Sequence, residues 1–219
     1  MTTKQYLRDD ALSGTTTIAD VISGEENIIR LTETWFHPQG GGQKADIGTI
    51  GAVNVIKVRH AEGGEVDHIV DSVEGITANQ NVLFAIDAKA RLINAAYHTV
   101  GHLIAHVGDD ACPSIKGVQG HHWPGEARVD FDGEAPDIEA LKDQIMKGVQ
   151  KAIDEDMPTE IVGDPFTDRK LKVGGWDAVG CGGTHLKSLG VIAKVEIGKI
   201  KVKKGQTRVR YEVEVKDNV

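Results

Sequence analysis

The stretch AKARLINAAYHTVGHLIAHV, residues 88–107, gives the clearest structural signal in the chain. Its alanine and leucine content and its lack of proline predict a helix. His98 and His102 are four residues apart, so a helix places them one turn apart on the same face. Since imidazole is a common zinc ligand, the pair predicts half of a metal site.

A second pair of metal-ligand residues, Cys181 and His185, lies far downstream in the segment CGGTH. Gly180, Gly182 and Gly183 surround the cysteine, which indicates a tight turn where the backbone can approach a ligand closely. Three imidazoles and one thiolate suit a tetrahedral site for one Zn²⁺ per chain. Two interpretations stay open, because four protein ligands also suit a purely structural zinc, whereas a catalytic zinc usually keeps one position for water.

The helix lacks the glutamate of the HExxH metalloprotease motif, because Thr99 and Val100 follow His98. No general base is therefore built into this helix. This counts against peptide hydrolysis and favours a more reactive bond, such as a carboxylic ester.

Composition places the chain among ordinary globular proteins, with 219 residues, 40% hydrophobic and 26% charged. No run approaches the roughly 18 apolar residues of a membrane span, and the N-terminal residues lack the apolar core of a signal peptide. We therefore expect a cytoplasmic protein with no membrane partner, in which Cys112 and Cys181 stay reduced. The net charge of -8 argues against broad nucleic-acid binding but leaves room for a local basic patch.

The order of sequence patterns predicts an α+β protein with two domains, residues 1–87 and 88–219. Short β-prone runs separated by glycine and polar turns predict a small N-terminal β-barrel; they are residues 16–22, 27–33, 48–59, 65–70 and 81–86. In the second region, apolar residues recur every three or four positions between Pro136 and Pro158, which predicts an amphipathic helix.

The C-terminal segment alternates between apolar and polar residues and predicts a hairpin that turns at Lys204–Gln206. One face is apolar. The other carries basic side chains: Lys199, Lys201, Lys203, Arg208 and Arg210. This face suits a polyanion, but a solvated edge that prevents strand aggregation is an equally good interpretation.

A glycine-rich segment, WFHPQGGGQ at residues 35–43, follows a β-prone run. It lacks the GKS/T ending of a phosphate-binding loop and does not lead into a helix. It could simply reverse the chain. It could also form a loop, flanked by Gln39 and Gln43, whose backbone N–H groups face a ligand.

Four segments together resemble the editing domain of alanyl-tRNA synthetase and its freestanding AlaX-type trans-editing relatives. They are FHPQGGGQ (36–43), RLINAAYHTVGHL (91–103), ARVDF (127–131) and CGGTH (181–185), and the similarity runs from about residue 29 to the end. The adenylation domain of the synthetase has no counterpart, so the resemblance implies a freestanding editor. It also implies a small N-terminal β-barrel followed by an α+β, zinc-containing editing domain with an antiparallel sheet.

The resemblance implies a zinc-dependent hydrolase that deacylates mischarged tRNA, with Ser-tRNA(Ala) as the first expectation and Gly-tRNA(Ala) as the second. A synthetase pocket made for alanine rejects an added hydroxyl by only about a hundredfold, so a second, hydrolytic site is needed. Two other functions stay open: a non-catalytic, zinc-stabilised module that binds tRNA or a synthetase, and a zinc hydrolase of small esters.

The residues that we expect at the functional site fall into four groups. The zinc ligands are His98, His102, Cys181 and His185. Residues expected to take part in catalysis are Cys181, Gln43 and Thr184. Substrate-binding residues are Gly40, Gly41, Gly42, Lys116, Gln119, His121, His122, Gly182 and Gly183. The tRNA backbone is assigned to Lys199, Lys201, Lys203, Arg208 and Arg210.

One departure from the family pattern concerns the pocket. Where the synthetase domain has Gln-Lys-Gly, this chain has Ile115-Lys116-Gly117, so the glutamine is absent. Gln119, His121 and His122 are the candidates to replace it.

Overall fold

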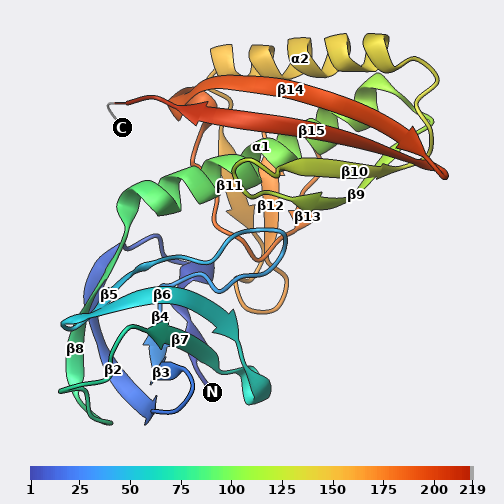
Figure 1. Ribbon diagram of the computed structural model, residues 1–219. Helices are drawn as coiled ribbons and strands as arrows, with labels where there is room; N and C mark the ends of the chain where they lie inside the picture. Colours follow the sequence, from blue (N-terminus) through green and yellow to red (C-terminus); the bar gives the residue numbers. More distant parts are fainter. Residues whose placement is uncertain (218–219) are drawn as a thin grey trace. The chain divides into compact units, whose positions relative to one another are not determined.

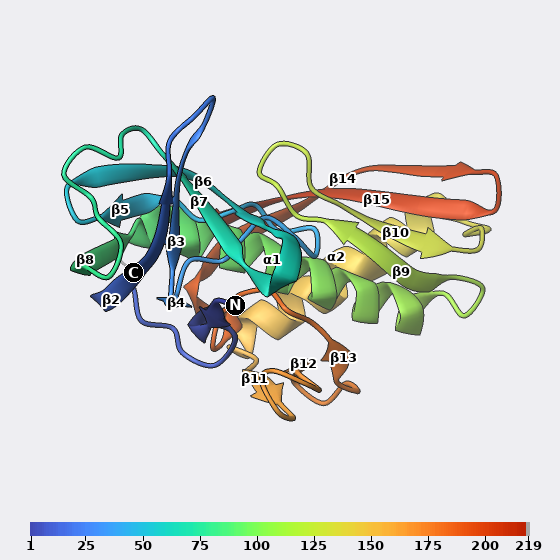
Figure 2. The same ribbon diagram turned by 90° about the horizontal axis from the view of Figure 1, so that it is seen from below.

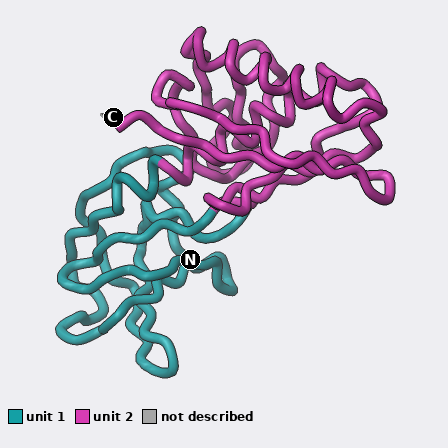
Figure 3. The backbone as a smooth tube through the Cα atoms, turned by 45° about the horizontal axis from the view of Figure 1, so that its top comes forward, with its two compact units in different colours: residues 1–40, 44–92 teal, residues 41–43, 93–219 magenta. Residues whose placement is uncertain are grey.

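The computed structural model describes residues 1–217, which form two compact units (Figures 1 and 3). One unit comprises residues 1–40 and 44–92; the other comprises residues 41–43 and 93–219. Three residues of the glycine-rich segment therefore belong with the C-terminal unit. The helix α1 (Ala88–Ala111) begins in the first unit and continues into the second.

The first unit is a closed antiparallel barrel, which confirms the predicted fold. Its strands follow one another around the barrel in the order β2 (Ser13–Ile22), β3 (Asn27–Leu31), β7 (Val66–Val70), β6 (Val53–His60), β5 (Gly48–Ile50) and β8 (Asn81–Ile86). The barrel closes where β8 pairs with β2. Two short strands, β1 (Thr3–Lys4) and β4 (Glu33–Thr34), pair in parallel beside it, and single 3₁₀ turns form at Gln5–Leu7 and Glu62–Gly64.

Strand alternation builds the barrel core. In β8, for example, Val82, Phe84 and Ile86 are buried while the residues between them are exposed. Phe84 stacks on the Trp35 ring with 4.8 Å between ring centroids. This period of two is the pattern of a strand with one face in the core.

A buried ion pair fixes both ends of the glycine-rich loop. The backbone N–H of Asp46 donates to the His37 carbonyl at 3.0 Å, and the N–H of His37 donates to Asp46 Oδ2 at 2.5 Å. Arg91, from the first turn of α1, donates Nε–H to Asp46 Oδ1 at 2.9 Å and Nη2–H to the Trp35 carbonyl at 2.7 Å. Since both charges are buried, removing either one would leave the other uncompensated.

The second unit is a four-stranded antiparallel sheet with helices on one face (Figures 1 and 2). The strand order is β14 (Ile192–Lys203), β15 (Gln206–Val215), β10 (Arg128–Asp132) and β9 (Lys116–His121). A separate three-stranded sheet contains β11 (Thr159–Val162), β12 (Lys170–Val173) and β13 (Val179–Gly180), and a 3₁₀ turn at Leu189–Val191 precedes β14.

Two helices cover the buried face of the larger sheet. Gly108 lets α1 pack closely on β10, because a Cβ at this position would lie 2.6 Å from the Phe131 ring. The second helix, α2 (Ile138–Asp154), packs against β14. Asp137 caps it by accepting a hydrogen bond from the Ala140 N–H at 2.9 Å. α1 extends four residues beyond its predicted end, to Ala111, since the first proline after it is Pro113.

No helix among residues 1–217 combines the length and the apolar character that crossing a membrane requires.

Candidate metal centre

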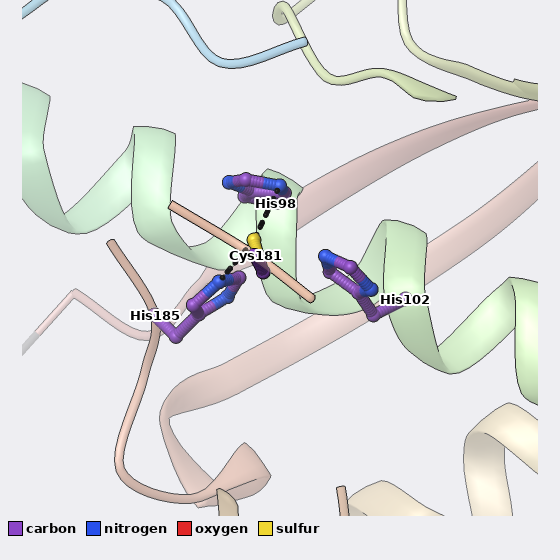
Figure 4. Close-up of side chains that lie close together, drawn as sticks. All are labelled: His98, His102, Cys181 and His185. Carbon is purple, nitrogen blue, oxygen red and sulfur yellow. Dashed lines mark hydrogen bonds between the residues drawn. The ribbon is translucent and has the colours of Figure 1, made fainter. Parts of the chain in front are cut away.

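Four side chains that are far apart in the sequence meet within the second unit (Figure 4). His98 and His102 project from α1, and Cys181 and His185 belong to the segment that follows β13. One nitrogen or sulfur donor atom of each residue lies within 4.8 Å of the others. Cys181 Sγ is 3.5 Å from His98 Nε2 and 3.1 Å from His185 Nε2. The cluster could therefore hold a metal ion.

The side chain of Gln43 orients His98. The backbone N–H of Thr184 donates to Gln43 Oε1 at 2.9 Å, and Gln43 Nε2 donates to Thr184 Oγ1 at 2.8 Å, which fixes the orientation of the amide. Gln43 Oε1 also lies 2.7 Å from His98 Nδ1. Because an amide oxygen only accepts, Nδ1 of His98 carries the proton, and its Nε2 directs a lone pair toward Cys181.

Thr99 orients His185 in the same way. Its hydroxyl donates to the Ala95 carbonyl at 2.8 Å, so the oxygen is left to accept from other groups. It accepts from the Leu186 N–H at 3.0 Å and lies 3.2 Å from His185 Nδ1. His185 therefore also carries its proton on Nδ1 and points an unprotonated Nε2 at the sulfur. A hydrogen bond on the outer nitrogen is typical of histidines that bind metals.

The surroundings of His102 indicate that the cluster suits a metal ion. Within the described part of the chain, its buried Nε2 has no hydrogen-bond partner. An orphaned buried nitrogen is costly unless something binds it. Burial lowers the pKa of His102 to about 4, so its ring is neutral and its lone pair is free to bind a cation. The donor set of three neutral imidazoles and a thiol fits zinc.

The thiol of Cys181 is not activated by its protein surroundings. Burial raises its pKa, and the hydrogen bond from the Gly183 N–H and the charge of Arg169 only partly oppose that effect. A thiolate at this position therefore depends on a bound cation, which would release the proton on binding.

His122 lies against the cluster and is itself held in place. Its ring stacks on His98 with 4.7 Å between centroids. The hydroxyl of Tyr211 donates to the Tyr97 carbonyl at 2.8 Å and thus accepts from His122 Nδ1 at 2.6 Å. Burial, followed by nearby basic groups, lowers the pKa of His122 to about 3, so the ring is neutral: Nδ1 donates to Tyr211 and Nε2 keeps a lone pair.

A cavity of about 510 Å³ opens beside the cluster. Of the predicted substrate-binding residues, it is lined by Gly41, Lys116, Gln119, His122 and Gly182. His121 is not part of this lining; it hydrogen-bonds Glu126 at 3.3 Å and packs on Trp123. Gly40 belongs to the barrel unit, where it packs against His60. The lining also includes residues that no sequence pattern singled out, among them His106, Asp109, Asp110, Trp176 and Asp177.

Two of the predicted glycines have packing roles instead. A Cβ on Gly183 would lie 2.2 Å from the His98 ring and 2.7 Å from Gln43 Oε1. Gly42 has a φ of 79° and lies so close to the Gly120 carbonyl that a Cβ would approach its oxygen to 2.4 Å. Both glycines therefore allow segments to approach closely around the cluster.

The five basic residues of the C-terminal hairpin are all exposed. They alternate along β14 and β15 with buried residues such as Ile200, Val209 and Tyr211. Arg208 is partly neutralised, because its Nε donates to Asp130 Oδ1 at 2.5 Å.

No family model matches the chain, but individual proteins do. The alanyl-tRNA editing protein AlaX-M of Pyrococcus horikoshii is 31% identical over 204 residues, which cover 92% of this chain and 90% of that protein. The chain belongs to the alanyl-tRNA editing protein family. The AlaX-M protein of Saccharolobus solfataricus is 25% identical over 240 residues, covering 97% of this chain and 99% of that protein.

Alanine–tRNA ligases are also similar, but only in part of their length. That of Methanosarcina acetivorans is 30% identical over 227 residues, which cover 88% of this chain but 24% of the ligase. The chain thus spans about a quarter of such a ligase and most of each AlaX-M protein.

The approach of Gly183 to His98 makes a prediction about metal affinity. In Gly183→Ala the new methyl group displaces the His98 ring or Gln43, so metal affinity falls by about 10–100-fold, as it does when a supporting contact of a ligand is lost. Gly182→Ala is the matched control, because a Cβ there meets nothing within 4 Å. Titration with Co²⁺, followed by thiolate-to-cobalt absorption, measures both. Equal affinities in the two variants would contradict the packing argument.

Proposed function

We propose that the chain is a zinc-dependent aminoacyl-tRNA deacylase that hydrolyses the ester of a wrong amino acid on alanine tRNA. Serine is the primary wrong amino acid and glycine the second. The observation that carries the proposal is the convergence of oriented imidazole lone pairs and a thiol beside an open cavity, in a chain whose relatives include proteins named alanyl-tRNA editing proteins. A cytoplasmic location, where charged tRNA is used, belongs to the same proposal.

One zinc ion would be held by His98, His102, Cys181 and His185, which together complete a tetrahedral set. Because four protein ligands leave a tetrahedral zinc ion no open position, the ion would organise the pocket and help to orient the aminoacyl group. The protein residues around it hold the acyl group against this centre and limit its movement. Positioning of this kind can supply much of the barrier reduction for an already reactive ester.

Gln43 and Thr184 act as positioning residues in this proposal and do not touch the substrate. Their side chains bond to one another, and Gln43 also bonds to His98, so both are buried and engaged. The sequence assigned them to catalysis. Their contacts support an indirect role, in which they hold the metal ligands in the correct tautomer and orientation.

We assign the discrimination of serine from alanine to polar residues that line the cavity. A site built to hydrogen-bond a hydroxyl rejects an analogue that lacks it, because the polar groups of the site are then left unpaired. Gln119 of β9 and His122 line the cavity and are the groups we assign to the serine hydroxyl. Lys116 also lines it, with its ammonium group paired to Asp109.

The exposed basic face of the hairpin is the surface we assign to the phosphates of tRNA. A protein with a net charge of -8 cannot attract RNA with its whole surface, so binding depends on a local patch. Lys199, Lys201, Lys203 and Arg210 supply the charge, and Arg208 adds less because of Asp130.

A deacylation panel tests the proposal. Wild-type protein is incubated with Ser-tRNA(Ala), Gly-tRNA(Ala) and Ala-tRNA(Ala), and loss of the ester is followed with and without a chelator. We expect the seryl ester to disappear fastest, the chelator to stop the reaction and added zinc to restore it. Cys181→Ala should be inactive, because it removes a ligand.

Cys112→Ala is the matched control, since Cys112 is the second cysteine and lies outside the cluster. It should retain full activity. Full activity in Cys181→Ala would contradict the assignment of the metal centre. Binding of all three tRNAs with loss of no ester would instead identify a non-catalytic module.

The basic face makes a separate prediction about salt. Each phosphate contact contributes about -0.7 to -0.9 to the slope of log affinity against log salt concentration. Lys201→Glu with Lys203→Glu should therefore flatten that slope for Ser-tRNA(Ala). Lys142→Glu with Lys147→Glu, on α2, changes the net charge equally and should leave the slope unchanged. If both pairs behave as wild type, the hairpin does not contact RNA, and a hydrolase of small esters becomes the better explanation.

A further inference from the structure

The cavity extends well beyond the metal-ligand cluster, along one face of α1. Apart from Asp110, the helix residues that line it recur every one, three or four positions along one face: His98, Gly101, His102, Ala105, His106 and Asp109. From His98 to Asp109 the helix rises about 16 Å, at 1.5 Å per residue. The cavity therefore has a metal end, near His98 and His102, and a distal end, near His106 and Asp109. The metal centre gives a function to the metal end only.

A stacked aromatic pair forms the distal end. The rings of His106 and Trp176 are nearly parallel, with 5.4 Å between centroids and 7° between planes. The indole Nε1–H donates to Asp110 Oδ2 at 2.7 Å, which fixes the ring in its plane. Trp176 is half-buried and lines the cavity. A large flat surface is thus held rigidly beside the ligand space.

The charge around this pair is unfavourable for phosphate. Asp109, Asp110 and Asp177 all line the distal end, where the one cationic group of the lining, Lys116, is already bound to Asp109. A phosphate group would meet an excess of carboxylates. A neutral aromatic base would not, and carboxylates can accept hydrogen bonds from the exocyclic amino group of such a base.

The spacing between the two ends matches the chemistry of an aminoacyl nucleoside. His106 lies four residues beyond His102, about 6 Å along the helix. In an aminoacyl-tRNA the amino acid is esterified to the terminal ribose, so the terminal base lies one sugar away from the ester. If the ester lies at the metal end, the base extends toward Trp176.

We propose that Trp176, held by His106 and Asp110, is the stacking platform for the terminal base of the tRNA 3′ end. This assignment rests on the proposed deacylase function and names a second contact of the same substrate. Single-stranded RNA ends are commonly bound by stacking on aromatic side chains, and each such stack contributes enough to alter affinity by about tenfold or more.

Steady-state kinetics with Ser-tRNA(Ala) test the platform. Trp176→Ala should raise KM about tenfold with little change in kcat, because stacking binds the substrate away from the ester. Trp176→Phe keeps an aromatic ring and should restore KM toward the wild-type value. Trp123→Ala is the matched control: that tryptophan also packs on a histidine, His121, with 5.0 Å between centroids, but does not line the cavity. It should leave KM unchanged.

Fluorescence gives a readout that does not depend on hydrolysis. Titration with the trinucleotide CCA should quench the tryptophan emission of wild-type protein in a saturable way. The quenching should be lost in Trp176→Phe, although Trp35 and Trp123 remain in that variant.

The outcomes separate the two proposals. An unchanged KM in Trp176→Ala, or a Trp176→Phe variant as impaired as Trp176→Ala, would overturn the platform while leaving the deacylase intact. Absence of CCA quenching in the wild type would also overturn it. If CCA quenches the fluorescence but the seryl ester is not hydrolysed, the base-binding site at Trp176 is supported and the proposed deacylase function is contradicted.

Discussion

The metal-ligand cluster depends on three hydrogen bonds that the buried side chain of Gln43 makes with Thr184 and His98. One end of the amide fixes the proton of His98, and both ends bind Thr184. The bonds therefore connect the glycine-rich loop, helix α1 and the segment that carries Cys181. Gly183 makes the connection sterically feasible, since a side chain there would collide with His98 and Gln43. Gly42 lets the loop approach the Gly120 carbonyl and His122 closely.

Helix α1 gives the site its geometry, because it carries the successive functional residues on a rigid element. Arg91, in its first turn, pairs with Asp46 and so fixes the end of the loop that contains Gln43. One face of the helix then presents His98, His102 and His106 in turn. Rigid support of this kind is what a site needs when its ligands must keep their orientation. It also lets a single cavity combine a metal-binding end with an aromatic end.

Local sequence patterns were sufficient to predict most of the secondary structure. Short β-prone runs separated by turns predicted the barrel strands, alternation predicted the hairpin, and the four-residue spacing predicted that His98 and His102 share a face. Contacts between distant segments could not be predicted in this way. Gln43 and Thr184 are 141 positions apart, and no local pattern shows that their side chains bond. The stack of Trp176 on His106 is equally non-local, so the aromatic end of the cavity appears only in the structure.

The central claim is that Gln43 orients His98 and thereby maintains the metal site required for ester hydrolysis. Zinc affinity and Ser-tRNA(Ala) deacylation, measured in parallel for Gln43→Leu, test it most directly. We predict a loss of about 10–100-fold in affinity, partial recovery of activity in excess zinc, and near-normal behaviour of Gln43→Glu, which keeps the acceptor. The exposed Gln39, as Gln39→Leu, controls for changes in the loop. Wild-type affinity and activity in Gln43→Leu would contradict the account.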